Sequence, residues 1–123
     1  MNKYTKEIQL FKALSHPARI AILEILRNGE QCVCHIEATL GLRQAYISQQ
    51  LMALRKAGIL AKRREGWNIY YRVTDAKVYI LLDSAYQITG MPRSLAKVVP
   101  STCTCPNCVS DAQEMMFIPE LEI

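Results

Sequence analysis

Five cysteines are the residues of this sequence whose type and spacing point most clearly to chemistry, and they fall into two groups. Cys32 and Cys34 flank a single valine, whereas Cys103, Cys105 and Cys108 lie within six residues of one another. Such dense thiols in an intracellular chain are typical of metal sites, and soft thiolates select soft ions such as Cd(II), Pb(II), Zn(II) and trivalent arsenic. The cysteines therefore predict a metal or metalloid site built from thiolates.

The spacing of Cys32 and Cys34 restricts how the two can act together. Residues two apart on a regular helix point to nearly opposite sides, so the pair shares one ion only if the first turn is extended or distorted. The pair follows Gly29, where a helix is expected to begin, and the positive N-terminal end of a helix favours a thiolate. Two plainer alternatives remain open: either residue could be a small buried apolar side chain, and the three later thiols could be incidental.

The segment 43–57 predicts the helix that would sit beside this site. Ile47, Leu51 and Leu54 recur at spacings of four and three, which places them on one apolar stripe. Gly58 then ends the helix, because glycine readily adopts the left-handed conformation that follows a last turn. The residues predicted to face away from the stripe are Gln44, Ala45, Ser48, Gln49 and Met52.

A β-hairpin is predicted directly after this helix. Runs at 60–64 and 69–73 are separated by four residues at 65–68, and the second run alternates apolar and polar side chains as a half-buried strand does. Before the helix, residues 31–40 suit a shorter helix and Gly41 suits a turn. The order of helix, turn, helix and hairpin predicts a winged helix-turn-helix, whose second helix can enter the major groove of DNA.

Charge supports DNA binding by this region. Between residues 43 and 72 there are seven basic residues against one acidic residue, although the formal net charge of the chain is only +4. We predict that Gln44, Ala45, Ser48 and Gln49 face base edges. The predicted contacts to phosphates and the minor-groove side come from Arg43, Lys62, Arg63, Arg64, Trp67 and Asn68. The alternative is an ordinary solvated helix and hairpin.

Composition and segment character set the domain organisation. With 123 residues, half of them apolar, the chain predicts one winged-helix domain over 1–90 and a cysteine-containing tail over 91–123. No apolar run approaches the ~20 residues that span a bilayer, and the N-terminal segment lacks the apolar core of a signal peptide. We therefore expect a cytoplasmic protein with no membrane partner, whose cysteines are reduced unless they are bound or oxidised as a signal. No nucleophile triad, phosphate loop or acid pair suggests an enzyme.

The motifs resemble those of the ArsR/SmtB family of winged-helix metalloregulatory repressors over residues 4–90. They occur in family order as SHPAR-x-x-IL, CVC, SQQL-x-x-L-R-x-AG and REG-x-x-x-YYRV. The resemblance implies a mainly α-helical fold with a small β-hairpin and a homodimer formed by the outer helices near 4–14 and 74–89. It also implies that Cys32 and Cys34 sense arsenite, cadmium or lead. The family usually has a serine-like cap at position 43, where this chain has Arg43.

These features predict a repressor that binds double-stranded operator DNA as a homodimer and is released when its thiolates capture As(III), or Cd(II) or Pb(II). The family's zinc site on the last helix is not expected, because 74–89 contains no histidine. The three tail cysteines either close over the CVC pair or form a separate site, and His35 is expected to be a surface bystander. Two alternatives are kept: a thiol-redox or persulfide sensor on the same scaffold, and a metal-buffering protein that does not bind DNA.

Overall fold

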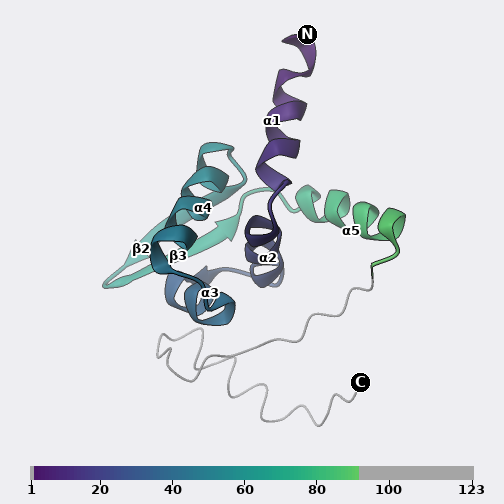
Figure 1. Cartoon of the computed structure of the whole chain (residues 1–123). Coiled ribbons are helices and arrows are strands. Elements are labelled where there is room, and N and C mark those ends of the chain that lie inside the picture. The colour runs from purple at the N-terminus through teal and green to yellow at the C-terminus, as the bar shows by residue number, and fades with distance from the viewer. Residues whose placement is uncertain (1, 92–123) are drawn as a thin grey trace.

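The structure, a computed structural model, describes residues 2–91 and combines short helices with a small antiparallel sheet (Figure 1). Along these residues the order is η1 (Asn2–Tyr4), α1 (Thr5–Leu14), α2 (Pro17–Ile25), β1 (Gln31–Cys32), α3 (Val33–Leu40), α4 (Gln44–Lys56), β2 (Leu60–Glu65), β3 (Asn68–Val73) and α5 (Lys77–Thr89). The predicted winged helix-turn-helix, mainly helical with a small hairpin, is confirmed. Over the same residues, every helix is too short or too polar to cross a membrane.

The sheet contains one more strand than the sequence predicted. β3 lies in the middle and pairs antiparallel with β2 on one side and with β1 on the other. The predicted helix over 31–40 is therefore wrong at its first two residues. Cys32 has extended backbone (φ −77°, ψ 158°) and lies opposite Tyr70 of β3, so the helix begins only at Val33.

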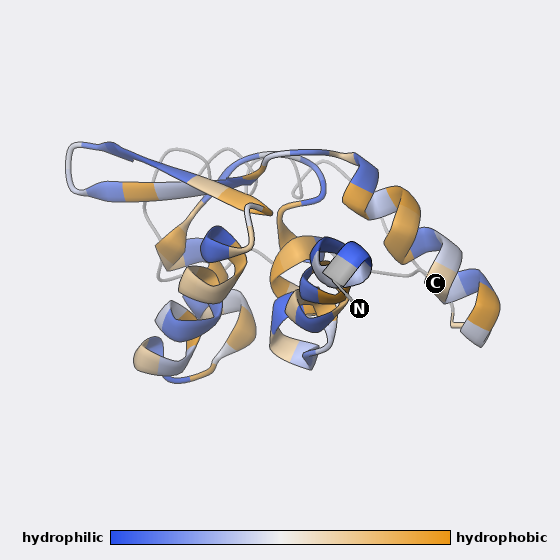
Figure 2. Ribbon diagram, turned by 90° about the horizontal axis from the view of Figure 1, so that it is seen from above, coloured by the Kyte–Doolittle hydropathy of each residue, from blue (hydrophilic) through white to orange (hydrophobic). Residues whose placement is uncertain are grey.

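The core lies where α2, α3 and α4 meet the sheet, and α2 stands between α4 and α5 (Figures 1 and 2). The predicted stripe of α4 is buried as expected, with Ile47, Leu51 and Leu54 at most 1% exposed. From α2, Ile22 and Leu23 are fully buried against them. Burial of these branched side chains is the main source of stability for such a small domain.

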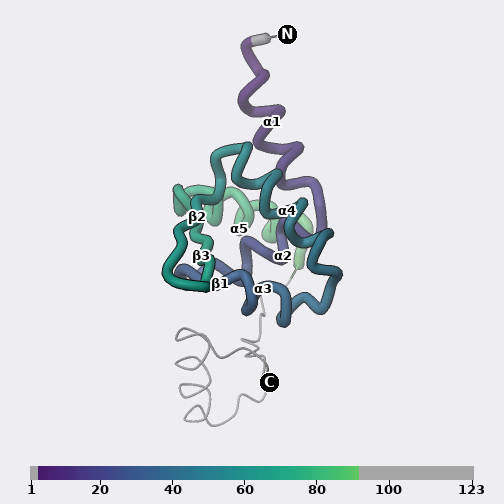
Figure 3. Tube along the Cα trace, turned by 90° about the vertical axis from the view of Figure 1, so that its left-hand side faces the viewer, coloured from purple at the N-terminus to yellow at the C-terminus, as the bar shows by residue number. Residues whose placement is uncertain are grey.

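The outer helices leave apolar side chains uncovered. α1 extends away from the other described elements, and α5 runs outward past α2 (Figures 1 and 3). Ile80 and Ile88 of α5 are 67% and 85% exposed, and apolar stretches recur along this helix (Figure 2). On α1, Ile8 and Phe11 are also exposed. Apolar surface of this size on two neighbouring helices is typical of a protein–protein interface.

α5 begins later than the sequence predicted. The segment from Thr74 was expected to open the helix, but its first residue is Lys77. The Thr74 hydroxyl instead donates a hydrogen bond to the carbonyl of Gly58 at 2.7 Å, and Asp75 accepts one from the Lys77 N–H at 2.9 Å. Thr74 therefore fastens the end of the wing to the end of α4, and Asp75, one residue before the N-cap Ala76, accepts from the first N–H of the helix.

A polar cluster ties α5 to α2. The guanidinium of Arg27 donates hydrogen bonds to Glu24 at 2.7 and 2.8 Å and to Asp83 at 2.9 and 3.2 Å. It also lies 4.6 Å from the ring centroid of Tyr79, whose hydroxyl donates to the Leu23 carbonyl at 2.6 Å. The Tyr86 hydroxyl donates to Glu24. These charge-assisted bonds add to the apolar packing of α5, whose Leu82 is buried in the core.

Both ends of the pH scale should weaken this cluster. Burial would raise the pKa of Glu24, but hydrogen bonds from Arg27 and Tyr86 and the charge of Arg27 bring it below its ordinary value of 4.5. Its stabilisation is therefore complete above pH 4.5 and is lost as the pH falls through the folded pKa. Burial, together with the bond to Glu24, raises the pKa of Tyr86 from 10.0 to about 12. The stability that neutral Tyr86 contributes is complete below pH 10.0 and is lost as the pH rises through the folded pKa of about 12.

Replacing Arg27 with methionine should lower the free energy of unfolding at pH 7 by about 1–3 kcal/mol, because two carboxylates lose their charged donor. The loss should shrink below pH 4.5, where Glu24 is increasingly protonated in the variant. Urea denaturation followed by circular dichroism between pH 4 and pH 8 measures both effects.

The matched control is Lys77→Met, which removes an exposed ion pair to Asp75 with a 3.8 Å separation. Its expected cost is at most about 0.5 kcal/mol, as for other exposed pairs. Equal losses for the two variants would show that the cluster around Arg27 contributes no more than an ordinary surface pair.

Candidate nucleic-acid interface and thiol site

The face of α4 that was predicted to read DNA lies on the outside of the molecule. Because Ile47, Leu51 and Leu54 point into the core, the opposite side of the helix faces solvent. The exposed residues are those predicted from the sequence: Gln44, Ala45, Ser48 and Gln49. An uncovered row of amide and hydroxyl groups on a helix of four turns can hydrogen-bond base edges in a major groove.

Two local features set the start of α4. Gly41 adopts a left-handed conformation (φ 65°), which ends α3 and turns the chain toward α4. Arg43 occupies the N-cap position with extended backbone and makes no side-chain capping bond. The weak cap expected from arginine at this position is confirmed, and the exposed guanidinium stands beside the helix N-terminus, where phosphates commonly bind.

Sequence reasoning missed one polar residue of α4. Gln50 is only 6% exposed, and its side-chain oxygen accepts a hydrogen bond from Arg19 Nε at 2.8 Å. Arg19 also donates to the carbonyls of Lys12 and Ala13 at the end of α1, at 3.4 Å each. The signal was available, since Gln50 falls three residues after Ile47 on the buried stripe. Arg19 therefore links the C-terminal end of α1 to α4.

The wing is formed by β2 and β3 and projects from the body beside α4 (Figures 1 and 3). Of its predicted DNA contacts, Lys62, Arg63 and Arg64 are exposed on β2, and Trp67 at the tip is 95% exposed. Asn68 is half-buried. A basic strand ending in an uncovered aromatic side chain suits the sugar-phosphate backbone next to a groove.

Arg63 differs from its two basic neighbours. It donates to Glu30 at 2.8–3.0 Å and to Glu65 at 2.7 Å, and these bonds raise the pKa of its guanidinium. It also lies 4.6 Å from the ring centroid of Tyr70. Among the described residues, Lys62 and Arg64 have no carboxylate partner. The positive charge of Arg63 is therefore already occupied within the protein.

The Cys32–Cys34 pair lies where β1 passes into α3. Cys32 is the last residue of β1 and is fully buried, and Cys34 lies in the first turn of α3 and is half-buried. Their sulfur atoms are joined in a disulfide, with the two Cα atoms 5.4 Å apart. Cys32 is extended while Cys34 is helical, and an extended or distorted first turn was the condition under which the two cysteines could act together. We expected thiols that are reduced unless they are bound or oxidised as a signal, and in this structure the two sulfur atoms are bonded to each other.

The surroundings of the pair differ from expectation at His35. We predicted an exposed bystander, but His35 is 4% exposed, and its backbone N–H donates to Cys32 Sγ at 3.3 Å. That bond makes Cys32 the cap of α3. Within residues 2–91, no three His, Cys, Asp or Glu side chains are grouped so as to hold an ion. The predicted ligands Cys103, Cys105 and Cys108 lie outside the described residues.

Two routes connect the pair to the DNA-binding elements. The expected route runs through α3, whose Ile36 shares the buried core with Ile47 and Leu51 of α4. The second was not expected: Cys32 packs with Tyr70, so the pair touches the central strand of the wing directly. The pair is therefore in contact with both α3 and β3.

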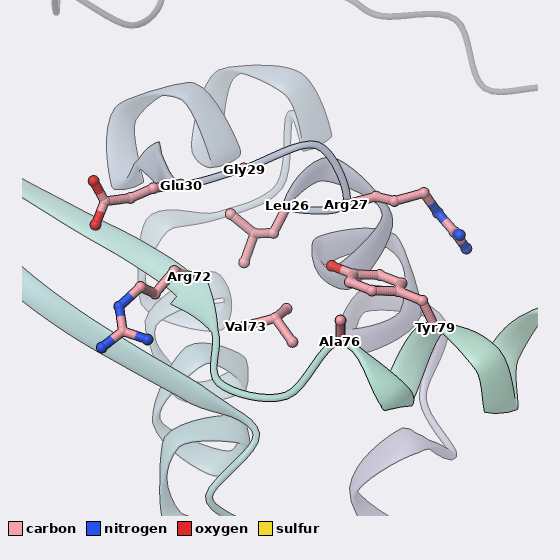
Figure 4. A pocket seen from close by; sticks show the side chains of 8 residues that line it. All are labelled: Leu26, Arg27, Gly29, Glu30, Arg72, Val73, Ala76 and Tyr79. Atoms are coloured by element: carbon pink, nitrogen blue, oxygen red, sulfur yellow. The ribbon is translucent and has the colours of Figure 1, made fainter.

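One hollow of about 170 Å³ lies between α2, β3 and the start of α5 (Figure 4). Leu26, Val73 and Tyr79 point into it, whereas the charged ends of Arg27 and Arg72 point away from it. The Tyr79 hydroxyl also enters it but already donates to the Leu23 carbonyl, so this is a packing gap rather than a site with chemistry of its own.

Comparison with known proteins agrees with this arrangement. Residues 16–62 match the family model described as bacterial regulatory protein, arsR family. A biofilm growth-associated repressor of Agrobacterium fabrum is 42% identical over 93 residues, which cover 75% of this chain and 80% of that protein. Rv0081 of Mycobacterium tuberculosis superposes with a TM-score of 0.67 at 35% identity, over 73% of this chain and 91% of that one.

A third relative adds information on assembly. The homodimeric winged helix-turn-helix DNA-binding domain of Mb0332 from Mycobacterium bovis, a possible ArsR-family transcriptional regulator, superposes with a TM-score of 0.62 at 27% identity. The match covers 74% of this chain and 89% of that domain. From its fold, its motifs and these relatives, the chain belongs to the ArsR/SmtB family of winged-helix transcriptional repressors.

Proposed function

We propose that this protein represses transcription as a two-fold dimer bound to double-stranded operator DNA. Exposed apolar side chains of α1 and α5, including Phe11, Ile80 and Ile88, supply a surface for a second copy. The homodimeric Mb0332 domain has the same fold. A two-fold dimer presents two copies of α4 to successive major grooves, which suits a near-palindromic operator.

In this complex, α4 reads sequence and the wing holds the backbone. Amide and hydroxyl groups of Gln44, Ser48 and Gln49 contact base edges, while Ala45 contacts a thymine methyl group. Arg43, Lys62, Arg64, Trp67 and Asn68 contact phosphates and the minor-groove side. Arg63 belongs to this set only when it leaves its two carboxylate partners.

The sensing site of the proposed repressor is the Cys32–Cys34 pair. The observation that carries this proposal is that both sulfur atoms lie together at the junction of β1 and α3, against Tyr70 of the wing. Once reduced, two adjacent thiols can bind one soft ion as thiolates, such as Cd(II), Pb(II) or Zn(II), and release two protons. As(III), supplied as arsenous acid, would bind the same two thiols with the loss of two molecules of water. Cys103, Cys105 and Cys108 are proposed to complete the coordination, since the described residues offer no third ligand group.

A second candidate signal is oxidation of the same pair, favoured by the disulfide that joins Cys32 to Cys34. A peroxide would take two electrons and two protons from the two thiols, leaving a disulfide and two molecules of water. A polysulfide would act likewise, with sulfur as the group reduced. Both signals use the same pair, so they differ in the reagent and not in the place where it acts.

The deciding experiment is a titration of operator DNA, followed by fluorescence anisotropy, with fully reduced protein under anaerobic conditions. Separate arms add As(III), Cd(II), Pb(II) or Zn(II), and a further arm adds hydrogen peroxide followed by dithiothreitol. Weaker binding with at least one soft ion supports the ion-sensing function. Weaker binding only with peroxide, restored by dithiothreitol, supports the redox function. Unchanged affinity in every arm contradicts both.

Salt dependence tests DNA binding itself against a metal-buffering role. A dimer that contacts six or more phosphates should lose roughly 1000-fold or more in affinity between 50 and 200 mM salt. A weak dependence on salt would contradict the proposed use of the wing and of Arg43.

A further inference from the structure

Three side chains form a row across one face of the sheet, and the row begins at the sensing pair. Cys32 of β1 lies opposite Tyr70 of β3, and Tyr70 lies opposite Arg63 of β2. Residues directly opposite one another in paired strands project from the same face of the sheet, so neighbouring members of the row are in contact range. Cys32 is fully buried and Tyr70 is 4% exposed.

The contacts along this row are specific at each step. Cys32 and Tyr70 form a small buried cluster of their own, with Cys34 packed against it. The guanidinium of Arg63 stacks on the other side of the row, 4.6 Å from the Tyr70 ring centroid. A cation over an aromatic face is held by the ring's negative face as well as by packing. Movement of the Tyr70 ring would therefore change the position of the Arg63 guanidinium.

Glu30 lies one residue before β1 and contacts the far end of the row. It accepts hydrogen bonds from Arg63 at 2.8–3.0 Å, and it lies two residues before Cys32. Glu65, the other partner of Arg63, is on the same strand as Arg63 itself. Of the two ion pairs of Arg63, the one to Glu30 therefore adds a side-chain tie between β2 and the segment that carries the cysteines, beside the pairing of β1 with β3.

We propose that Tyr70, Arg63 and Glu30 are positioning residues that transmit the state of the Cys32–Cys34 pair to the wing. With the sulfurs joined, Arg63 is latched to Glu30 and withheld from DNA. With the sulfurs reduced, the Tyr70 ring moves, the latch opens, and Arg63 contacts a phosphate. The inference rests on the proposed function of the cysteine pair as the switch. It adds that the availability of the Arg63 guanidinium for DNA depends on the state of that pair.

The test compares Glu30→Gln with the matched control Glu65→Gln, using the ratio of operator affinities between reduced protein and protein treated with As(III) or peroxide. Glu30→Gln should strengthen binding by the treated protein by about two- to fivefold per protomer, the range carried by an exposed ion pair, and so shrink the ratio. Glu65→Gln should leave the ratio at the wild-type value. Equal ratios in all three proteins would overturn the proposal.

A salt series adds a second readout. Because the reduced protein uses Arg63 on a phosphate, Arg63→Ala should lower the slope of log affinity against log salt by about one per protomer, in the reduced form only. The same decrease in both forms would contradict a latch.

Fluorescence of Trp67 distinguishes failure of the Arg63–Glu30 proposal from failure of the proposed sensing by the Cys32–Cys34 pair. It is the single tryptophan of the chain and lies 95% exposed at the wing tip, so its emission reports the wing without DNA. If wild-type operator binding ignores As(III) and peroxide, the proposed function fails. The latch is then upheld if peroxide changes Trp67 emission in wild type and in Glu65→Gln but not in Glu30→Gln. Unchanged emission in the wild type overturns it.

Discussion

Replacing Cys34 with serine should abolish the response of this repressor to its signal while leaving operator binding by the reduced protein within about twofold of wild type. A coupling of about 2 kcal/mol or more, or roughly 30-fold in affinity, would disappear, because one thiol can neither chelate with its neighbour nor form the disulfide. Cys34 is the better choice for this test because it is half-buried. Cys32 is fully buried and caps α3 through the N–H of His35, so its loss would also weaken the fold.

The matched comparison is Cys105→Ser, which tests the tail thiols separately. Native mass spectrometry of the reduced dimer with each ion, combined with operator anisotropy, measures stoichiometry and release together. If the tail completes the site, Cys105→Ser should weaken ion binding without removing the response to peroxide. An undiminished response of Cys34→Ser to every ion and to peroxide would remove the pair from the mechanism.

Gln49→Ala should weaken binding to the operator by about 1–3 kcal/mol, which is the discrimination carried by one well-placed contact to a base edge. Gln49 is exposed on α4, opposite the buried stripe, so its removal leaves the core intact. Binding to unrelated DNA should change little, because the basic wing and Arg43 are retained. Anisotropy on operator and on scrambled DNA, at one fixed salt concentration, measures the two affinities.

Asn28→Ala is the control, since it removes an exposed amide from the turn after α2 rather than from α4, the wing or the exposed apolar face of α5. It should leave both affinities unchanged. Equal losses on operator and scrambled DNA for Gln49→Ala would mean that this side chain contacts the backbone and carries no sequence preference.

The DNA-binding half of the fold was predictable because its signals are local. The spacing of Ile47, Leu51 and Leu54 gave the buried stripe of α4, and the side chains between them gave its exposed face. The hairpin followed from alternation in its second strand, and its observed limits differ from the predicted ones by a single residue at each turn end. Periodicity and turn chemistry depend only on neighbours within a few residues.

What sequence reasoning missed depends on partners far along the chain. β1 has two residues, too few for any alternation, and it exists because Cys32 pairs with Tyr70. The bond from Arg63 to Glu30 spans 33 residues, so it could not be read from a run of basic residues. His35 looked like a surface residue because histidine is polar, and its burial next to Ile36 depends on how α3 packs in the fold. Such tertiary contacts override local preference.

The way α5 is held has a consequence for the geometry of promoters. In the proposed dimer, α5 joins the two copies, and its orientation is set by the bonds of Tyr79, Asp83 and Tyr86 to α2. In such a dimer, the spacing of the two copies of α4 would depend on these polar bonds and on the packing of Leu82, as well as on the contact between the two copies. If the bonds of Tyr79, Asp83 and Tyr86 were weakened, one dimer would accept operator half-sites at several spacings. If they were strengthened, the dimer would bind only half-sites at one spacing.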